Sequence, residues 1–157
     1  MKTSNERILT THVGSLPRSK AVTDLVFAKE NNETIDDETF NETIKKAVDA
    51  VVARQVKSGV DIVSDGEMSK ISYATYIKDR ITGFEGDSPR NPPRDLEDFP
   101  GFMQRAAKGG TTPTYSRPCC VSAIKVKSTL PLQDDIATFQ ASIEKHQPHE
   151  AFMNAAS

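Results

Sequence analysis

Two glycine-containing turns carry the residues that could do chemistry. In the first, Gly14 and Ser15 follow the β-prone segment 7–13. Glycine lets the backbone approach a ligand closely, and the free backbone amides of such a turn suit a carboxylate. Ser15 adds a hydroxyl that donates and accepts, and His12 could donate to the same ligand. The alternative is an ordinary strand–turn–helix junction in which His12 makes a structural hydrogen bond.

The second turn is acidic and follows the β-prone segment 60–64. Asp65 and Glu67 stand on either side of Gly66. Two carboxylates at the end of a strand can neutralise an ammonium group or position a substrate proton. They could also ligate a metal ion, but no His or Cys nearby in the sequence supports a metal site. The alternative is a solvated acidic turn.

Three further residues carry reactive or charged groups. Cys119 and Cys120 are adjacent, so they lack the C-x-x-C spacing of redox and zinc motifs, and a bridge between them would be strained. We interpret them as reduced thiols with a buried structural role in a cytoplasmic protein. Arg117 precedes a strand-like segment and could meet a substrate anion, although a solvated arginine fits its position equally well.

Composition excludes several classes of partner. The chain has 157 residues and a formal net charge of −2, so the size is that of one ordinary domain and no electrostatic feature favours nucleic acid or an anionic membrane. Its apolar stretches are far shorter than the ~20 residues that a membrane span needs. The N-terminal residues are polar and charged and have no apolar segment behind them, which is not typical of a signal peptide.

The hydrophobic periodicity predicts alternating strands and helices. The clearest element is a helix over 36–58, where apolar residues recur at steps of three and four, Asp36 can cap the start and Gly59 can end it. Shorter helices are expected at 19–29, 72–81 and 133–145, and strands at 7–13, 60–64, 119–126 and 150–157.

This order indicates an α/β fold with a parallel sheet and helical crossovers. A complete (β/α)₈ barrel takes ~250 residues, and four strands cannot close one. We therefore predict that residues 1–157 form one incomplete barrel domain, roughly the first half, with a long irregular excursion at about 83–118 that is rich in proline and glycine. The open sheet should expose an apolar edge that favours self-association.

Two motifs together resemble a known family. Segments 10–18 (TTHVGSLPR) and 59–67 (GVDIVSDGE), with the closing segment 151–157 (AFMNAAS), are similar to the catalytic domain of cobalamin-independent methionine synthase. The shorter single-barrel members, often called methionine synthase II, look most alike. The similarity spans essentially the whole chain, and it is the pairing of the first two motifs that makes it specific.

The resemblance implies a (β/α)₈ barrel enzyme that moves a methyl group from a methyltetrahydrofolate polyglutamate to the thiol of homocysteine. Zinc binds that thiol as thiolate in the complete family enzyme and makes it the nucleophile. The resemblance assigns contact with the amino-acid substrate to Val13, Gly14 and Ser15, and assigns its ammonium group to Glu67. His12, Asp65 and Arg117 are further candidates for substrate binding.

The sequence departs from the family at the metal. The family's zinc ligands are a His, two Cys and a Glu from later strands, and nothing in this chain matches them, so no metal ligand is assigned. We expect the chain to supply the amino-acid-binding part of the site and to be inactive alone. Two alternatives remain: a non-catalytic truncated or split-gene product that binds a ligand or a complementary barrel half, or a related enzyme that alkylates another thiol.

Overall fold

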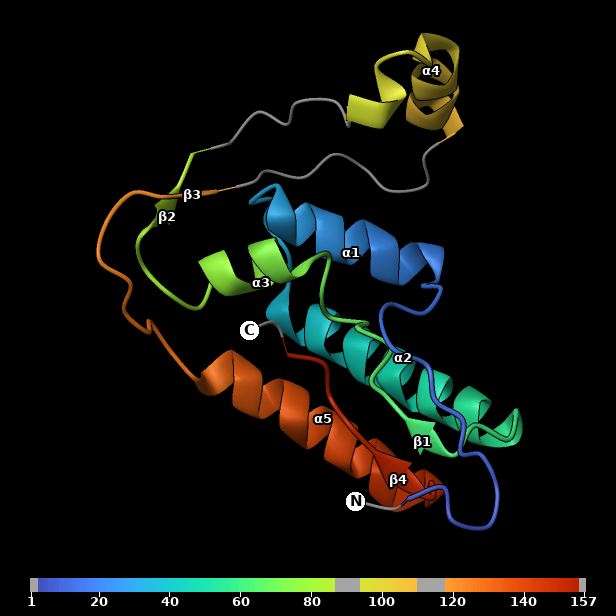
Figure 1. Ribbon diagram of the computed structural model, residues 1–157. Helices are drawn as coiled ribbons and strands as arrows, with labels where there is room; N and C mark the ends of the chain where they lie inside the picture. The colour runs from blue at the N-terminus through green and yellow to red at the C-terminus, as the bar shows by residue number, and fades with distance from the viewer. Residues whose placement is uncertain (1–2, 87–93, 110–117, 156–157) are drawn as a thin grey trace.

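Helix α2, Asp37–Lys57, is the element against which helices α1 and α5 pack (Figure 1). Its bounds follow from its sequence. The Asp36 carboxylate accepts a hydrogen bond from the Thr39 amide at 2.8 Å, and Gly59 takes a left-handed conformation just after the C-cap. This confirms the helix predicted over 36–58.

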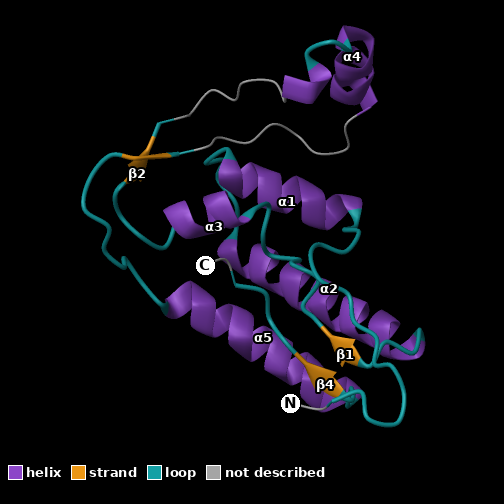
Figure 2. Cartoon of the chain, in the orientation of Figure 1, coloured by secondary structure: helices purple, strands orange, loops and turns teal. Residues whose placement is uncertain are grey.

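The computed structural model describes residues 3–86, 94–109 and 118–155. The remaining helices are α1 (Lys20–Glu30), α3 (Tyr73–Lys78), α4 (Pro100–Gly109), α5 (Leu130–His146) and a short 3₁₀ helix (Arg94–Leu96). The strands are β1 (Ile62–Val63), β2 (Phe84–Glu85), β3 (Cys119–Cys120) and β4 (Glu150–Ala151), and Figure 2 shows how little of the chain they occupy. The mixture of helix and strand confirms the predicted α/β class in its coarse form.

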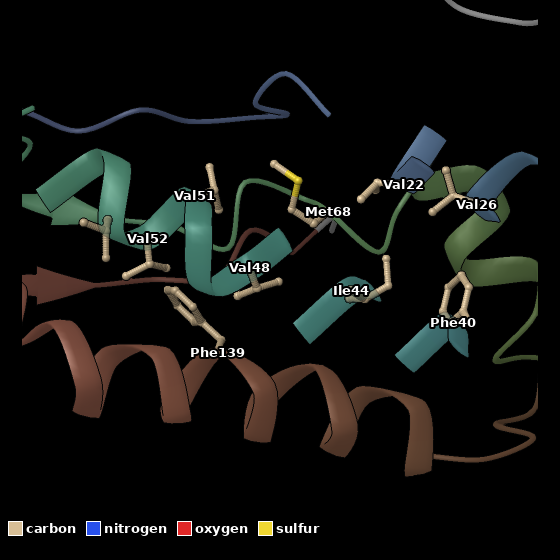
Figure 3. Close-up of a cluster of buried hydrophobic side chains, with 10 residues drawn as sticks. Val22, Val26, Phe40, Ile44, Val48, Val51, Val52, Met68 and Phe139 are labelled. Atoms are coloured by element: carbon tan, nitrogen blue, oxygen red, sulfur yellow. The ribbon is translucent and has the colours of Figure 1, made fainter. Parts of the chain in front are cut away.

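The apolar core lies between the helices and one face of the β1–β4 pair (Figure 3). Helix α2 contributes half of its buried residues, and Val52 and Val63 are fully buried. Burying a side chain of this size stabilises the fold by roughly 1.5–3 kcal/mol. The buried apolar members of the core are Val22, Val26, Phe40, Ile44, Val48, Val51, Val52, Val63, Met68 and Phe139.

Parallel pairing joins three segments of the described chain. Ile62 pairs with Glu150 and Val63 with Ala151, while Thr11 forms a single parallel bridge to Ile62. Strand β1 is therefore central, with the N-terminal segment on one side and β4 on the other. Because β1 and β4 pair in parallel, both carboxyl ends point toward the same edge, which is where such folds build sites.

The strand predicted at 7–13 is wrong as a regular strand. Its backbone pairs with the segment at β1 only around Thr10 and Thr11, and the Thr10 amide donates to the Asp61 carboxylate at 2.8 Å. Arg7 also donates to both oxygens of that carboxylate. One buried aspartate therefore ties the N-terminal segment to the start of β1.

The strand predicted at 119–126 exists only as Cys119–Cys120 and does not belong to the parallel sheet. Strand β3 pairs antiparallel with β2, and Ile81 bridges Val126 further along. β-Propensity favoured a strand here but could not choose its partner, and the nearer partner lies at the other end of the excursion. Of that excursion, 87–93 and 110–117 fall outside the described residues.

The predicted burial of Cys119 and Cys120 is also wrong. Both cysteines are free and exposed. They lie on β3, whose side chains do not enter the apolar core, so adjacency to apolar residues in the sequence did not bring burial. Within the described ranges, no helix has the length and apolar character needed to cross a membrane.

Asp61 should make the free energy of unfolding depend on pH in the acid range. Hydrogen bonds from Arg7 and Thr10 hold the pKa of this carboxyl well below its usual range. A depressed folded-state pKa contributes stability above the ordinary value of about 3.9, and this contribution declines as the pH falls below it. We expect Asp61→Asn to flatten the fall in the free energy of unfolding between about pH 5 and pH 3, measured by urea denaturation.

The control for this prediction is Asp98→Asn, which alters an exposed carboxyl outside the core. It should keep the wild-type dependence on pH. An unchanged dependence in Asp61→Asn would contradict the role given to the Arg7–Asp61 contact.

Candidate functional site

The two turns singled out in the sequence meet in the structure. The Ser15 hydroxyl donates to Glu67 Oε2 at 2.5 Å, and the Leu16 amide donates to the carbonyl oxygen of Gly66 at 3.1 Å. The first contact joins the side chains and the second joins the backbones. The polar groups that follow these two neighbouring parallel segments therefore lie in direct contact.

Asn154 completes this arrangement from a third segment. Its side-chain amide donates to Glu67 Oε1 at 2.8 Å, so each oxygen of the carboxylate accepts from a neutral donor. The sequence analysis did not single out Asn154. The strand predicted over 150–157 placed Asn154 inside a strand, whereas β4 ends at Ala151 and Asn154 lies three residues beyond it.

The backbone at Glu67 has an unusual conformation. Gly66 and Glu67 both have positive φ angles, of 62° and 56°. A left-handed residue other than glycine costs roughly 1–2 kcal/mol and persists only where its surroundings impose it. A Cβ on Gly66 would lie 3.0 Å from the Met68 side chain and 3.2 Å from Leu16, so any other residue here would also force these neighbours to shift.

A buried ion pair supports the acidic turn from within. Asp65 Oδ2 lies 2.9 Å from Lys70 Nζ, and the two side chains are only 5% and 4% exposed. Asp65 Oδ1 accepts from the Glu67 amide at 3.1 Å. The structure thus directs both Asp65 oxygens to the turn itself, although the sequence analysis had proposed this residue for substrate binding.

Arg18 supports the same turn from outside. Its guanidinium donates to the carbonyl oxygen of Glu67 at 2.7 Å and also to that of Lys70. Burial lowers the pKa of Arg18 from its usual value, against the opposing effect of the Glu67 and Asp65 carboxylates. The guanidinium therefore lies close to the acidic turn and bonds to its backbone.

Helix α2 fixes the end of β1 through Gln55. The buried Gln55 amide donates to the Ser64 carbonyl oxygen at 2.8 Å, and the Ser64 amide donates back to Gln55 Oε1 at 3.1 Å. This reciprocal pair replaces the contacts that a further strand residue would make. The acidic turn therefore begins from a point held by the longest helix described.

His12 lies elsewhere. It lines a cavity of about 360 Å³ against α2, together with Leu16, Val51 and Gln55. Its Nε2 atom is buried and has no hydrogen-bond partner among the described residues. Successive residues of an extended segment face opposite sides, so His12 faces the helix while the 68%-exposed Val13 faces away from it.

The remaining predicted site residues can be placed in part. Gly14 has a φ angle of 99°, and a Cβ built on it would meet nothing within 4 Å, so the conformation and not crowding favours glycine. Arg117 lies outside the described residues. The structure therefore brings Ser15 and Glu67 together, adds Asn154, and separates His12 from them.

The described residues do not fit a zinc ion. No group of three or more His, Cys, Asp or Glu side chains within 3–86, 94–109 and 118–155 could hold a metal. Cys119 and Cys120 belong to the β2–β3 sheet and not to the strands that carry Glu67 and Asn154. No metal-assisted step is therefore assigned to the described residues.

A parallel α/β unit with an acidic site at its carboxyl edge is the class that fold and site define. Residues 8–89, just over half of the chain, match the family model described as cobalamin-independent synthase, catalytic domain. The chain belongs to this family. The matched stretch contains both turns of the site, though not Asn154.

Curated relatives share this stretch. A 5-methyltetrahydropteroyltriglutamate–homocysteine methyltransferase from Bifidobacterium longum is 31% identical over 75 residues, which are 48% of this chain and 10% of that protein. A methionine synthase from Saccharolobus islandicus is 32% identical over 80 residues, which are 51% of this chain and 24% of that protein. The aligned part of this chain thus spans at most about a quarter of the length of either relative.

Replacing Glu67 should reveal the left-handed backbone directly. Glu67→Gly and Glu67→Ala both remove the carboxylate, but only glycine adopts a positive φ without strain. We expect the glycine variant to be more stable than the alanine variant by about 1 kcal/mol, measured by urea denaturation.

Glu42 provides the matched control. It is exposed in the right-handed helix α2, so Glu42→Gly should be less stable than Glu42→Ala by about 1 kcal/mol. If the order at position 67 were the same as at position 42, Glu67 would not be left-handed in solution.

Proposed function

We propose that this chain supplies the amino-acid-binding part of a thiol methyltransferase of methionine biosynthesis, built on the first strands of a (β/α)₈ barrel. The observation that carries the proposal is the convergence of Ser15, Asn154 and Glu67 at the carboxyl ends of three parallel segments. Barrel enzymes place their sites at this end. Membership of the family supports the same reading.

The site suits a small zwitterion. The Glu67 carboxylate provides the negative charge for an ammonium group, and Ser15 and Asn154 fix the direction of that carboxylate. The turn at Gly14 and Ser15 provides backbone amides for the substrate carboxylate. Val13, which is 68% exposed, offers an apolar surface to the substrate side chain.

The names of the relatives suggest the chemistry. The Bifidobacterium longum protein is named for a methyltetrahydropteroyltriglutamate and for homocysteine. We propose a homocysteine-like thiol amino acid as acceptor and a methyltetrahydrofolate polyglutamate as donor. The thiolate-activating zinc of the complete family enzyme has no ligand set among the described residues, so methyl transfer itself is assigned to family segments beyond them.

The architecture of the proposal is one incomplete barrel domain over 1–157. Parallel sheets are normally covered on both faces, and here the helical core covers one face of the β1–β4 pair. A complementary barrel portion, or a second copy of the chain, would cover the other face and complete the site. We place this assembly in the cytoplasm.

Binding of amino acids by the purified chain tests the proposal. We expect calorimetry to detect L-homocysteine and L-methionine but not N-acetyl-L-methionine, which lacks the ammonium group that Glu67 would hold. Glu67→Gln keeps the shape of the side chain and removes its charge, so it should weaken binding at least about tenfold, since a hydrogen bond to a charged group contributes about 1.5–3 kcal/mol.

Glu97→Gln, at an exposed position away from the site, is the matched control and should bind as the wild type does. Equal binding of the acetylated and free amino acids would contradict the proposal. So would wild-type affinity in Glu67→Gln.

A further inference from the structure

We propose that Arg18 is a positioning residue, which acts on the bound amino acid only through the backbone of Glu67. The guanidinium bonds to the outside of the acidic turn while the Asp65–Lys70 pair holds the inside. Together they keep Glu67 in its left-handed conformation. The part of this inference that concerns affinity rests on the proposed function, and the part that concerns conformation does not.

The first step is that Glu67 cannot hold this conformation by itself. A residue with a Cβ prefers the right-handed or extended region, so the left-handed backbone needs support from other residues. If the residue relaxed to a negative φ, the Cα–Cβ bond would point in another direction. The carboxylate would then leave both Ser15 and Asn154.

The second step is the geometry of Arg18. One guanidinium nitrogen donates to the carbonyl oxygens of both Glu67 and Lys70. These two carbonyls belong to the same turn, because the Lys70 amide donates to the Glu67 oxygen at 3.1 Å. A donor shared by both ends of a turn resists its opening, and the half-buried position of Arg18 strengthens each bond.

The third step is the set of contacts that Asp65 makes with the turn. One oxygen of its carboxylate accepts a hydrogen bond from the Glu67 amide, and the other accepts from the Lys70 ammonium group. Lys70 also lies over the ring of Tyr76, 5.4 Å from its centroid, which connects the turn to helix α3. Arg18 and Asp65 therefore both bond to the same two residues, Glu67 and Lys70.

Two residues of the motif that contains Gly14, Ser15 and Arg18 therefore contact different parts of Glu67. Ser15 contacts the Glu67 carboxylate, whereas Arg18 contacts only the main chain behind it. These two hydrogen bonds connect Arg18 to the backbone of the turn, and through it to the residue that Ser15 contacts.

The test uses the whole chain and two variants of Arg18. Arg18→Met keeps the aliphatic stem and removes every donor, while Arg18→Lys keeps the charge but loses the planar fork. Arg54→Met is the matched control, because Arg54 is exposed on α2. Circular dichroism establishes a temperature at which each variant is folded.

Two readouts separate positioning from simple stability. In the ligand-free protein, the ¹³Cα and ¹³Cβ shifts and the three-bond HN–Hα coupling of Glu67 report its φ angle. Arg18→Met should move these signals toward right-handed or extended values, Arg18→Lys should move them less, and Arg54→Met should leave them unchanged. Calorimetry with L-homocysteine should show about a tenfold loss of affinity in folded Arg18→Met.

Wild-type Glu67 signals in Arg18→Met would overturn the inference, as would wild-type affinity in a folded Arg18→Met that otherwise binds homocysteine. If Arg18→Met does not fold, unchanged Glu67 signals in Arg18→Lys overturn it. If the wild-type chain binds no amino acid, the proposed function fails, and the Glu67 signals alone decide whether Arg18 positions this residue.

Discussion

The left-handed backbone at Gly66 and Glu67 is the constraint on which the site depends. It turns the chain at the end of β1 so that the Glu67 carboxylate faces Ser15 on one side and Asn154 on the other. The conformation is costly for a glutamate, so the surrounding contacts must impose it. The absence of a side chain at Gly66, where a Cβ would lie 3.0 Å from Met68, allows the turn to pack against the core.

Buried polar contacts transmit the rigidity of the helices to this turn. Gln55 on α2 exchanges two hydrogen bonds with Ser64, and the Asp65–Lys70 pair follows immediately. Removing either partner of a buried ion pair would leave a charge without compensation, at a cost of roughly 3–5 kcal/mol. The apolar core sets where the strands lie, and these polar contacts set the direction in which the site residues point.

Sequence patterns predicted the elements whose information is local. Helix α2 was predictable because its apolar spacing, its Asp36 cap and its terminal Gly59 all act within one segment. The meeting of Ser15 with Glu67 was expected from the two turns and the family resemblance. The N-terminal strand was mispredicted because its pairing with β1 is limited to one bridge at Thr11, while the neighbouring Thr10 amide bonds to the Asp61 side chain. The segment after Cys119 was mispredicted because propensity does not specify which partner a strand selects. Asn154 was missed because nothing in its own neighbourhood reveals that it reaches Glu67.

A double-mutant cycle between Ser15→Ala and Glu67→Gln, read as the free energy of unfolding of the ligand-free chain, tests most directly whether the two turns meet. A hydrogen bond to a carboxylate is worth about 1.5–3 kcal/mol, so the account predicts a coupling energy of at least about 1 kcal/mol between these positions. Strictly additive effects of the two substitutions would show that the serine turn and the acidic turn do not touch in solution, and would contradict the account.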